Sequence, residues 1–174
     1  MHTNVSLVVV ELNVYHPVLE RAIMERALIV HDESHSTEPL LREAATLAAG
    51  VDAELVLLSL VTPEELDQDL ETLETIADIE HTDYGADTVL QSAVVATEEH
   101  AGDVIGDVDV EYTAVASIAD DGVASTIIET AVQNDCDHIF LAGRKRSPTG
   151  KVLFGDVAQS VLLNFEGRVT VELS

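Results

Sequence analysis

The chain has 174 residues, which is most simply one domain with a substantial hydrophobic core. It carries 33 Asp and Glu residues against eight Lys and Arg residues, with a formal net charge of −25 and a pI near 4.2. This charge argues against nucleic acid and anionic membranes as partners, because both require a cationic surface. It is typical of a halophilic protein, since high salt screens the repulsion between carboxylates.

The first 24 residues contain one apolar run, Val5–Val10. No Lys or Arg precedes this run, and it is too short to cross a membrane, so we expect a cytoplasmic protein. Residues 1–24 are predicted to be a weakly ordered extension. The alternative is that Val5–Val10 adds an edge strand to a domain formed by residues 25–174.

Strand and helix patterns alternate along the rest of the chain. Thr62-Pro63-Glu64-Glu65 is a strong helix start, Gly50 is expected to end the preceding helix, and Asp120 or Asp121 is expected to cap a later one. We predict strands at 27–30, 54–61, 108–116, 138–142 and 168–173, and helices at 37–50, within 64–87, and at 88–100, 121–134 and 155–164. This α/β order predicts an open, five-stranded parallel sheet with helices on both faces.

Half of the cations lie in one loop between the strand 138–142 and the helix 155–164. They are Arg144, Lys145, Arg146 and Lys151, and Gly150 lies among them. A Gly-rich basic loop between a strand and a helix N-terminus commonly holds phosphate. The loop therefore predicts a site for a small anionic ligand. The alternative is a solvated turn whose cations offset nearby carboxylates.

Two motifs carry a resemblance to a known family. An apolar strand, Leu28-Ile-Val-His, ends in Asp32, and Gly143 and Gly155 bracket the basic loop. Over about residues 25–174 the chain resembles universal stress proteins, a Rossmann-like, adenine-nucleotide-hydrolase-like family. The resemblance implies a stress-response module that binds ATP or another adenine nucleotide, with Asp32 near the adenine.

The motif diverges from the ATP-binding branch of that family. Arg146 stands where the family has its second glycine, and Asp156 replaces the Ser or Thr after the last one. A carboxylate at a helix N-terminus competes with a phosphate for the same backbone amides. The candidate ligand-binding residues are Asp32, Leu60, Ala142, Gly143, Arg144, Lys145, Arg146, Gly150, Lys151, Gly155, Asp156 and Val157.

No enzymatic signature is present: the chain has neither a Gly-x-Ser-x-Gly elbow nor a complete phosphate-binding P-loop. We therefore expect a protein that is not an enzyme. His31-Asp-Glu-Ser-His35 allows a metal site, but adjacent residues of an extended chain point apart. We expect no metal beyond an ion carried by the nucleotide. Cys136 is expected to be a core residue rather than a nucleophile.

The strand 168–173 is predicted to lie at a sheet edge without proline or inward charge to protect it. The family resemblance implies that it pairs with its copy in a homodimer. Two functions remain open from the sequence. One is a module that binds a nucleotide or phosphate-bearing ligand, and the other is a dimeric interaction module that binds no ligand.

Overall fold

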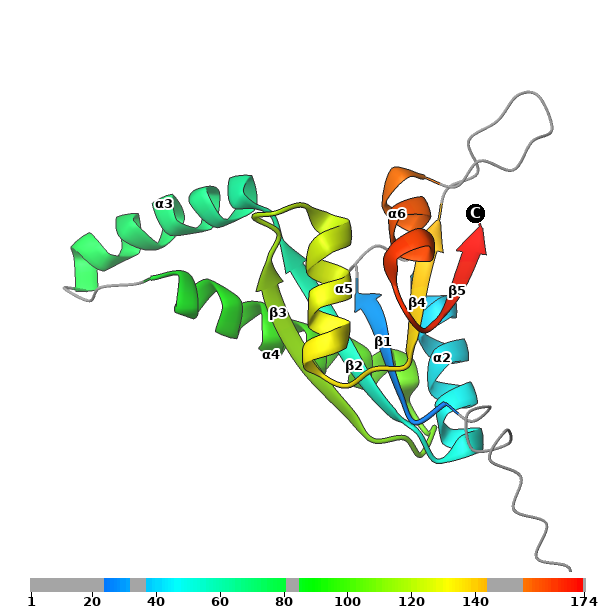
Figure 1. Ribbon diagram of the computed structural model, residues 1–174. Coiled ribbons are helices and arrows are strands. Elements are labelled where there is room, and N and C mark those ends of the chain that lie inside the picture. Colours follow the sequence, from blue (N-terminus) through cyan, green and yellow to red (C-terminus); the bar gives the residue numbers. More distant parts are fainter. Residues whose placement is uncertain (1–23, 32–36, 81–84, 144–154, 174) are drawn as a thin grey trace, which may run out of the picture.

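The computed structural model describes residues 24–31, 37–80, 85–143 and 155–173. Five parallel strands form one sheet in the order β3-β2-β1-β4-β5 (Figure 1). They are β1 (Arg26–His31), β2 (Glu54–Val61), β3 (Tyr112–Ile118), β4 (His138–Gly143) and β5 (Arg168–Leu173). The predicted open parallel sheet is therefore confirmed, and every strand is parallel to its neighbours.

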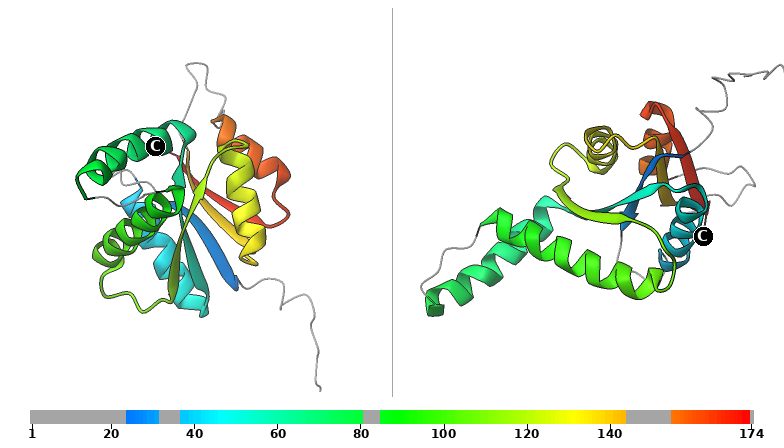
Figure 2. Two further views of the ribbon diagram at one scale, coloured as in Figure 1. Left: turned by 90° about the vertical axis from the view of Figure 1, so that its left-hand side faces the viewer. Right: turned by 90° about the horizontal axis from the view of Figure 1, so that it is seen from below.

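Helices cover both faces of the sheet, as the alternating pattern predicted (Figure 2). Helices α2 (Glu38–Val51) and α4 (Ala86–Ile105) pack on one face, against Ile29 of β1 among others. Helices α5 (Val123–Gln133) and α6 (Asp156–Asn164) pack on the other, where Leu28 points. Consecutive β1 residues thus enter opposite halves of the core, which explains why the central strands are apolar throughout.

Helix α3 (Pro63–Glu80) is the exception, because it projects away from the sheet beside the first half of α4 (Figures 1 and 2). None of its side chains between Pro63 and Leu73 is buried. We call α3 together with residues 86–96 of α4 the arm. Within the described residues, no helix is both long and apolar enough to span a membrane.

Two predicted helix boundaries were wrong. Helix α2 runs through Gly50 to Val51, and Asp52 then takes the left-handed conformation with φ 59°. Asp tolerates this conformation because its short polar side chain can bond locally. Neither Asp120 nor Asp121 caps α5, which follows Gly122 at φ 98° without a side-chain capping bond. Only glycine adopts that backbone angle without strain.

Two further elements are displaced from their predicted ranges. Strand β3 begins at Tyr112, which is paired with Leu55, rather than at Val108. Val108 and Val110 instead pack against the core cluster on the α2/α4 side, so their alternation reflects packing before the strand starts. Helix α4 continues past His100 to Ile105, because Ala101 and Ile105 extend its buried stripe.

Candidate functional site

The carboxyl ends of the strands lie at one edge of the sheet, where β1 and β4 are neighbours. The chain proceeds from β1 to β2 and β3 on one side and places β4 and β5 on the other. The gap between β1 and β4 is therefore the topological switch point, which is where open α/β sheets bind ligands. Any side chain at the ends of these two strands is well placed to meet a ligand.

A cavity of about 860 Å³ opens at this edge, beside β1. The last residues of two strands form its floor: Val30 and His31 end β1, and Ser59, Leu60 and Val61 end β2. Leu60, one of the candidate residues, thus lines the cavity. This volume is in the usual range for small-molecule sites.

The arm forms the remaining walls of the cavity. Helix α3 contributes one face that includes Gln68, Asp69 and Thr72, and α4 contributes a face that includes Ser92 and Ala93. Neither face was identified as part of a site from the sequence. The only signal in the sequence was that polar residues of α3 recur every three or four positions, on one side of the helix. Exposed acidic helices show the same pattern, so it does not indicate a site.

Helix α3 is held at its start by the predicted capping box. The amide and the hydroxyl of Thr62 donate to Oε2 of Glu65 at 2.8 and 2.9 Å. The Glu65 amide donates back to the Thr62 hydroxyl at 3.2 Å. This reciprocal pair sets the direction in which the arm leaves β2.

His31 is only 8% exposed and packs against a second histidine. Its ring lies 5.0 Å from the ring of His100, and Nε2 of His100 lies 3.9 Å from Oε1 of Glu38. The floor of the cavity therefore rests on α4 and on the first turn of α2. No cluster of three or more potential metal ligands occurs in the part of the chain that the structure describes.

The second group of candidate residues lies at the ends of β4 and α6, outside the cavity lining. Ala142 is exposed, whereas Gly143 is buried against Val171 of β5. A Cβ atom on Gly143 would lie 2.7 Å from Cγ1 of Val171 and 3.2 Å from Cδ2 of Leu173. Gly143 is thus required by strand packing, whatever it contributes to a ligand.

Gly155 is the N-cap of α6, with an extended backbone and no side-chain capping bond. No described atom would lie within 4 Å of a Cβ built there, so a small side chain at Gly155 would meet none of the described residues. Asp156 is the first helical residue and is exposed, and Val157 is 38% exposed. Backbone amides at a helix N-terminus are suited to an anion, and the Asp156 carboxylate opposes one.

Six candidate residues lie outside the residues that the structure describes. They are Asp32, Arg144, Lys145, Arg146, Gly150 and Lys151. Their roles remain predictions from the sequence.

The three described cations lie away from the cavity. Arg26 and Arg168 begin β1 and β5, at the amino end of the sheet. Arg42 donates to the carbonyl of Val104 at 2.9 Å and pairs with Asp107. No described Lys or Arg therefore lines the cavity, whose acidic lining residues are Glu65 and Asp69.

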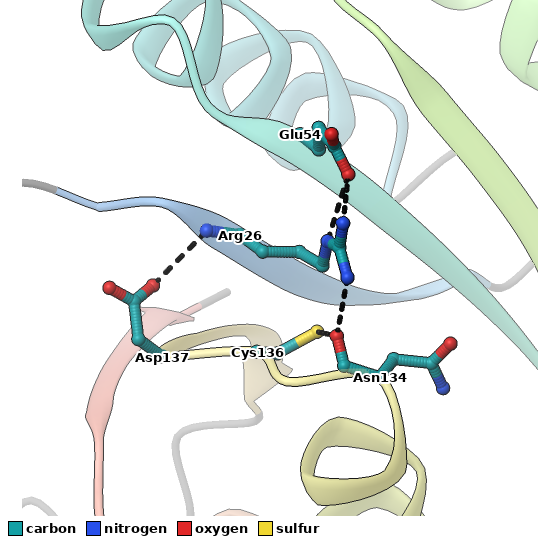
Figure 3. A network of polar contacts seen from close by, with 5 residues as sticks. All are labelled: Arg26, Glu54, Asn134, Cys136 and Asp137. Carbon is teal, nitrogen blue, oxygen red and sulfur yellow. Dashed lines mark hydrogen bonds and ion pairs between the residues drawn. The ribbon is translucent and has the colours of Figure 1, made fainter.

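Arg26 belongs to a polar network at the amino end (Figure 3). Its guanidinium donates to Glu54 and, at 3.1 Å, to the carbonyl of Asn134. The ion pair with Glu54 raises the pKa of Arg26. The nearby Cys136 is buried, and desolvation raises the pKa of its thiol to about 11. The thiol is thus protonated at neutral pH, as expected for a core residue.

Comparison with known proteins gives the family. The model of the universal stress protein family matches residues 24–171. No curated protein sequence matches the chain.

Solved structures of universal stress proteins share the fold. One from Archaeoglobus fulgidus is 23% identical, with a TM-score of 0.59, and the match covers 85% of this chain and 97% of that one. A complex with dAMP from the same organism is 16% identical, with a TM-score of 0.56 and coverage of 85% and 96%. A complex with cAMP is 15% identical, with a TM-score of 0.54 and coverage of 87% and 98%.

The family match covers β1 to β4 completely and β5 as far as Val171. The chain therefore belongs to the universal stress protein family.

Proposed function

We propose that this protein binds an adenine nucleotide at the carboxyl edge of its sheet and acts as a stress-response module. The observation that carries the proposal is the cavity of about 860 Å³ at the carboxyl ends of β1 and β2. Strand β1 also borders the switch point, so the cavity lies next to the place where open α/β sheets bind ligands. Structures of similar fold in complex with dAMP and cAMP support an adenine nucleotide as the ligand class. ATP is one member of this class.

The ligand places its base and ribose in the cavity and its phosphate toward the switch point. Two features favour this orientation: no described Lys or Arg lines the cavity, and α6 follows β4, on the other side of the switch point, with its N-terminus available as an anion-binding group. The basic loop with Arg144, Lys145, Arg146 and Lys151 supplies charge to the phosphate in place of the glycine-rich backbone.

The test uses a variant that fills the cavity. Replacing Ala93 with Leu places a larger side chain on the α4 wall, whereas Val95→Leu changes the same helix at a residue outside the lining. In high salt, a saturating adenine nucleotide raises the melting temperature of the wild type and of Val95→Leu. It leaves that of Ala93→Leu unchanged. A ligand at about 100 times its Kd stabilises the native state by about 2.7 kcal/mol.

If AMP, ADP and ATP all leave the wild type unaffected at about 1 mM, where even weak sites are occupied, the nucleotide proposal is wrong. The dimeric interaction module then becomes the better explanation. If Ala93→Leu responds like the wild type, the nucleotide binds elsewhere.

The dimer is proposed to form through β5, which pairs with β4 on one side and has no described strand on the other. Glu172 on this strand has a buried oxygen, Oε2, without a hydrogen-bond partner among the described residues. A second copy that pairs with this edge would form a closed, two-fold assembly. Light scattering tests this: the full chain should be a dimer, and a chain ending at Gly167 should be monomeric or insoluble.

The remaining parts of the proposal follow from composition and from missing motifs. The protein is a cytoplasmic, salt-adapted binding module without catalytic activity. It requires no metal other than one bound to the nucleotide, and it does not bind nucleic acid or membranes. The net charge of −25 supports the exclusion of nucleic acid and of anionic membranes as partners. Incubation with ATP in high salt, followed by phosphate release, tests the absence of hydrolysis.

A further inference from the structure

Helix α3 turns a polar stripe into the cavity. Glu65, Gln68, Asp69 and Thr72 line it, with the spacing i, i+3, i+4 and i+7 that places residues on one face of a helix. In a helix packed on a core, this stripe is apolar. Here it faces a hollow, so it fits an occupant that carries hydrogen-bonding groups.

The residues of α4 that line the cavity recur with the same spacing, but they are mostly apolar. This stripe consists of Val89, Ser92, Ala93 and Ala96, which are small or apolar. Small side chains leave room beside the helix and offer a surface that contacts an apolar face by dispersion. One polar wall and one apolar wall together suit a flat ring with polar groups on its edge, as in a nucleobase.

The polar wall contains one carboxylate that is free to meet such a ring. Oε2 of Glu65 already accepts two bonds from Thr62 in the capping box. Asp69 makes no hydrogen bond or ion pair with any residue that the structure describes. An ionised carboxylate only accepts hydrogen bonds, so Asp69 can bond to a ligand only through a donor on that ligand. Asp69 is exposed, so this bond would replace bonds to water.

We propose that Asp69 is a specificity-determining residue that accepts a hydrogen bond from the amino group of a purine base. This inference rests on the proposed nucleotide site. A bound base displaces water from the exposed Asp69 carboxylate, so a purine without an exocyclic amine removes bonds to water and supplies no donor in return. The same carboxylate repels phosphate from the arm end of the cavity and so sets the ligand's orientation.

The experiment compares AMP with purine riboside 5′-monophosphate, which lacks only the 6-amino group. Calorimetric titration of the full-length wild type should show a preference for AMP of roughly tenfold or more, as expected for a hydrogen bond to a charged group. Asp69→Ala should bring this preference below about threefold by weakening AMP binding.

Asp67→Ala is the matched control. It removes the same charge from the same exposed helix, two residues away and outside the cavity lining, so it should keep the preference for AMP. Circular dichroism of both variants verifies that α3 still forms.

Each other outcome overturns the inference. If the wild type binds both nucleotides equally, or if Asp69→Ala keeps the preference for AMP, Asp69 does not recognise the amino group of the base. The proposed nucleotide site is then unaffected. If the wild type binds neither nucleotide, the proposed function fails and the inference fails with it.

Discussion

Arg26 and Glu54 are direct register partners on β1 and β2, and their side chains form an ion pair across the two strands. The Arg26 guanidinium also donates to the carbonyl of Asn134 after α5, as Figure 3 shows. One cation thus links two strands and the end of a helix at the amino edge of the sheet.

This arrangement predicts that replacing either residue of the pair lowers the melting temperature by a different amount. Arg26→Ala should lower the melting temperature more than Glu54→Ala, because only Arg26 also bonds to Asn134 and because the chain is strongly anionic. The double variant should unfold near the Arg26→Ala temperature. Equal effects of the two single changes would show that the Asn134 bond contributes nothing.

Asp137 should be a stabilising residue for the same edge. Its carboxylate accepts bonds from the amides of Glu25 and Arg26 at 3.2 to 3.4 Å. Asp137→Ala removes the acceptor for both amides and should cost about 0.5–1.5 kcal/mol in chemical denaturation, because water can still reach the amides. Asp137→Asn keeps one acceptor oxygen and should cost less.

A chain starting at Met24 retains both amides, so we expect it to unfold as cooperatively as the full chain.

Gly143 and Gly155 should respond differently to alanine, although both belong to the same sequence motif. Gly143→Ala places a methyl group against Val171 and should cost about 1–3 kcal/mol. Val171→Ala in that background should recover part of the loss. Gly155→Ala meets no described atom, but it places alanine at the N-cap of α6 and should cost about 0.5–1 kcal/mol. Denaturation of the three variants shows whether side-chain packing requires each glycine.

His138 should make the fold less stable at mildly acidic pH. Burial lowers its pKa below 6.5, with a further contribution from Arg168, and its Nε2 lies 2.8 Å from the Thr170 hydroxyl. Because the folded pKa is the lower one, the unfolded chain binds the proton more readily. The stabilisation is present above pH 6.5 and is lost as pH falls through the folded value.

Chemical denaturation between about pH 7.5 and about pH 5.5, on either side of the free histidine pKa, measures this effect. His138→Gln should lose less stability over this range than the wild type does. An identical pH dependence in both proteins would contradict the assignment.

Much of the fold was predictable because its strands are buried on both faces. The apolar run Glu54–Val61 coincides with β2, and Thr62 with Glu65 marks the start of α3. The alternation of such runs with amphipathic helices leaves few possible topologies. Strand β3 was harder, because Val108 and Val110 alternate like a strand but lie before it, partly buried against the core on the α2/α4 side.

The candidate site was only partly predictable. Leu60 lines the cavity, but Asp69 was not identified, because an exposed acidic helix usually faces solvent. The packing role of Gly143 was also missed, since it depends on Val171 of a strand that follows later in the chain. Both features arise from contacts between elements, which residue spacing within one element does not encode.

The arm has a consequence for dynamics. Since α3 buries no side chain between Pro63 and Leu73, its amides should exchange with deuterium through local opening, at a free energy well below that of global unfolding. The eight Asp and Glu residues of α3 repel one another, so dilute buffer should favour local opening of the helix and concentrated salt its folded form. An occupant of the cavity should slow exchange in α3 while leaving β1 unaffected. The affinity of this protein for its ligand would then be set partly by the ionic strength of its surroundings.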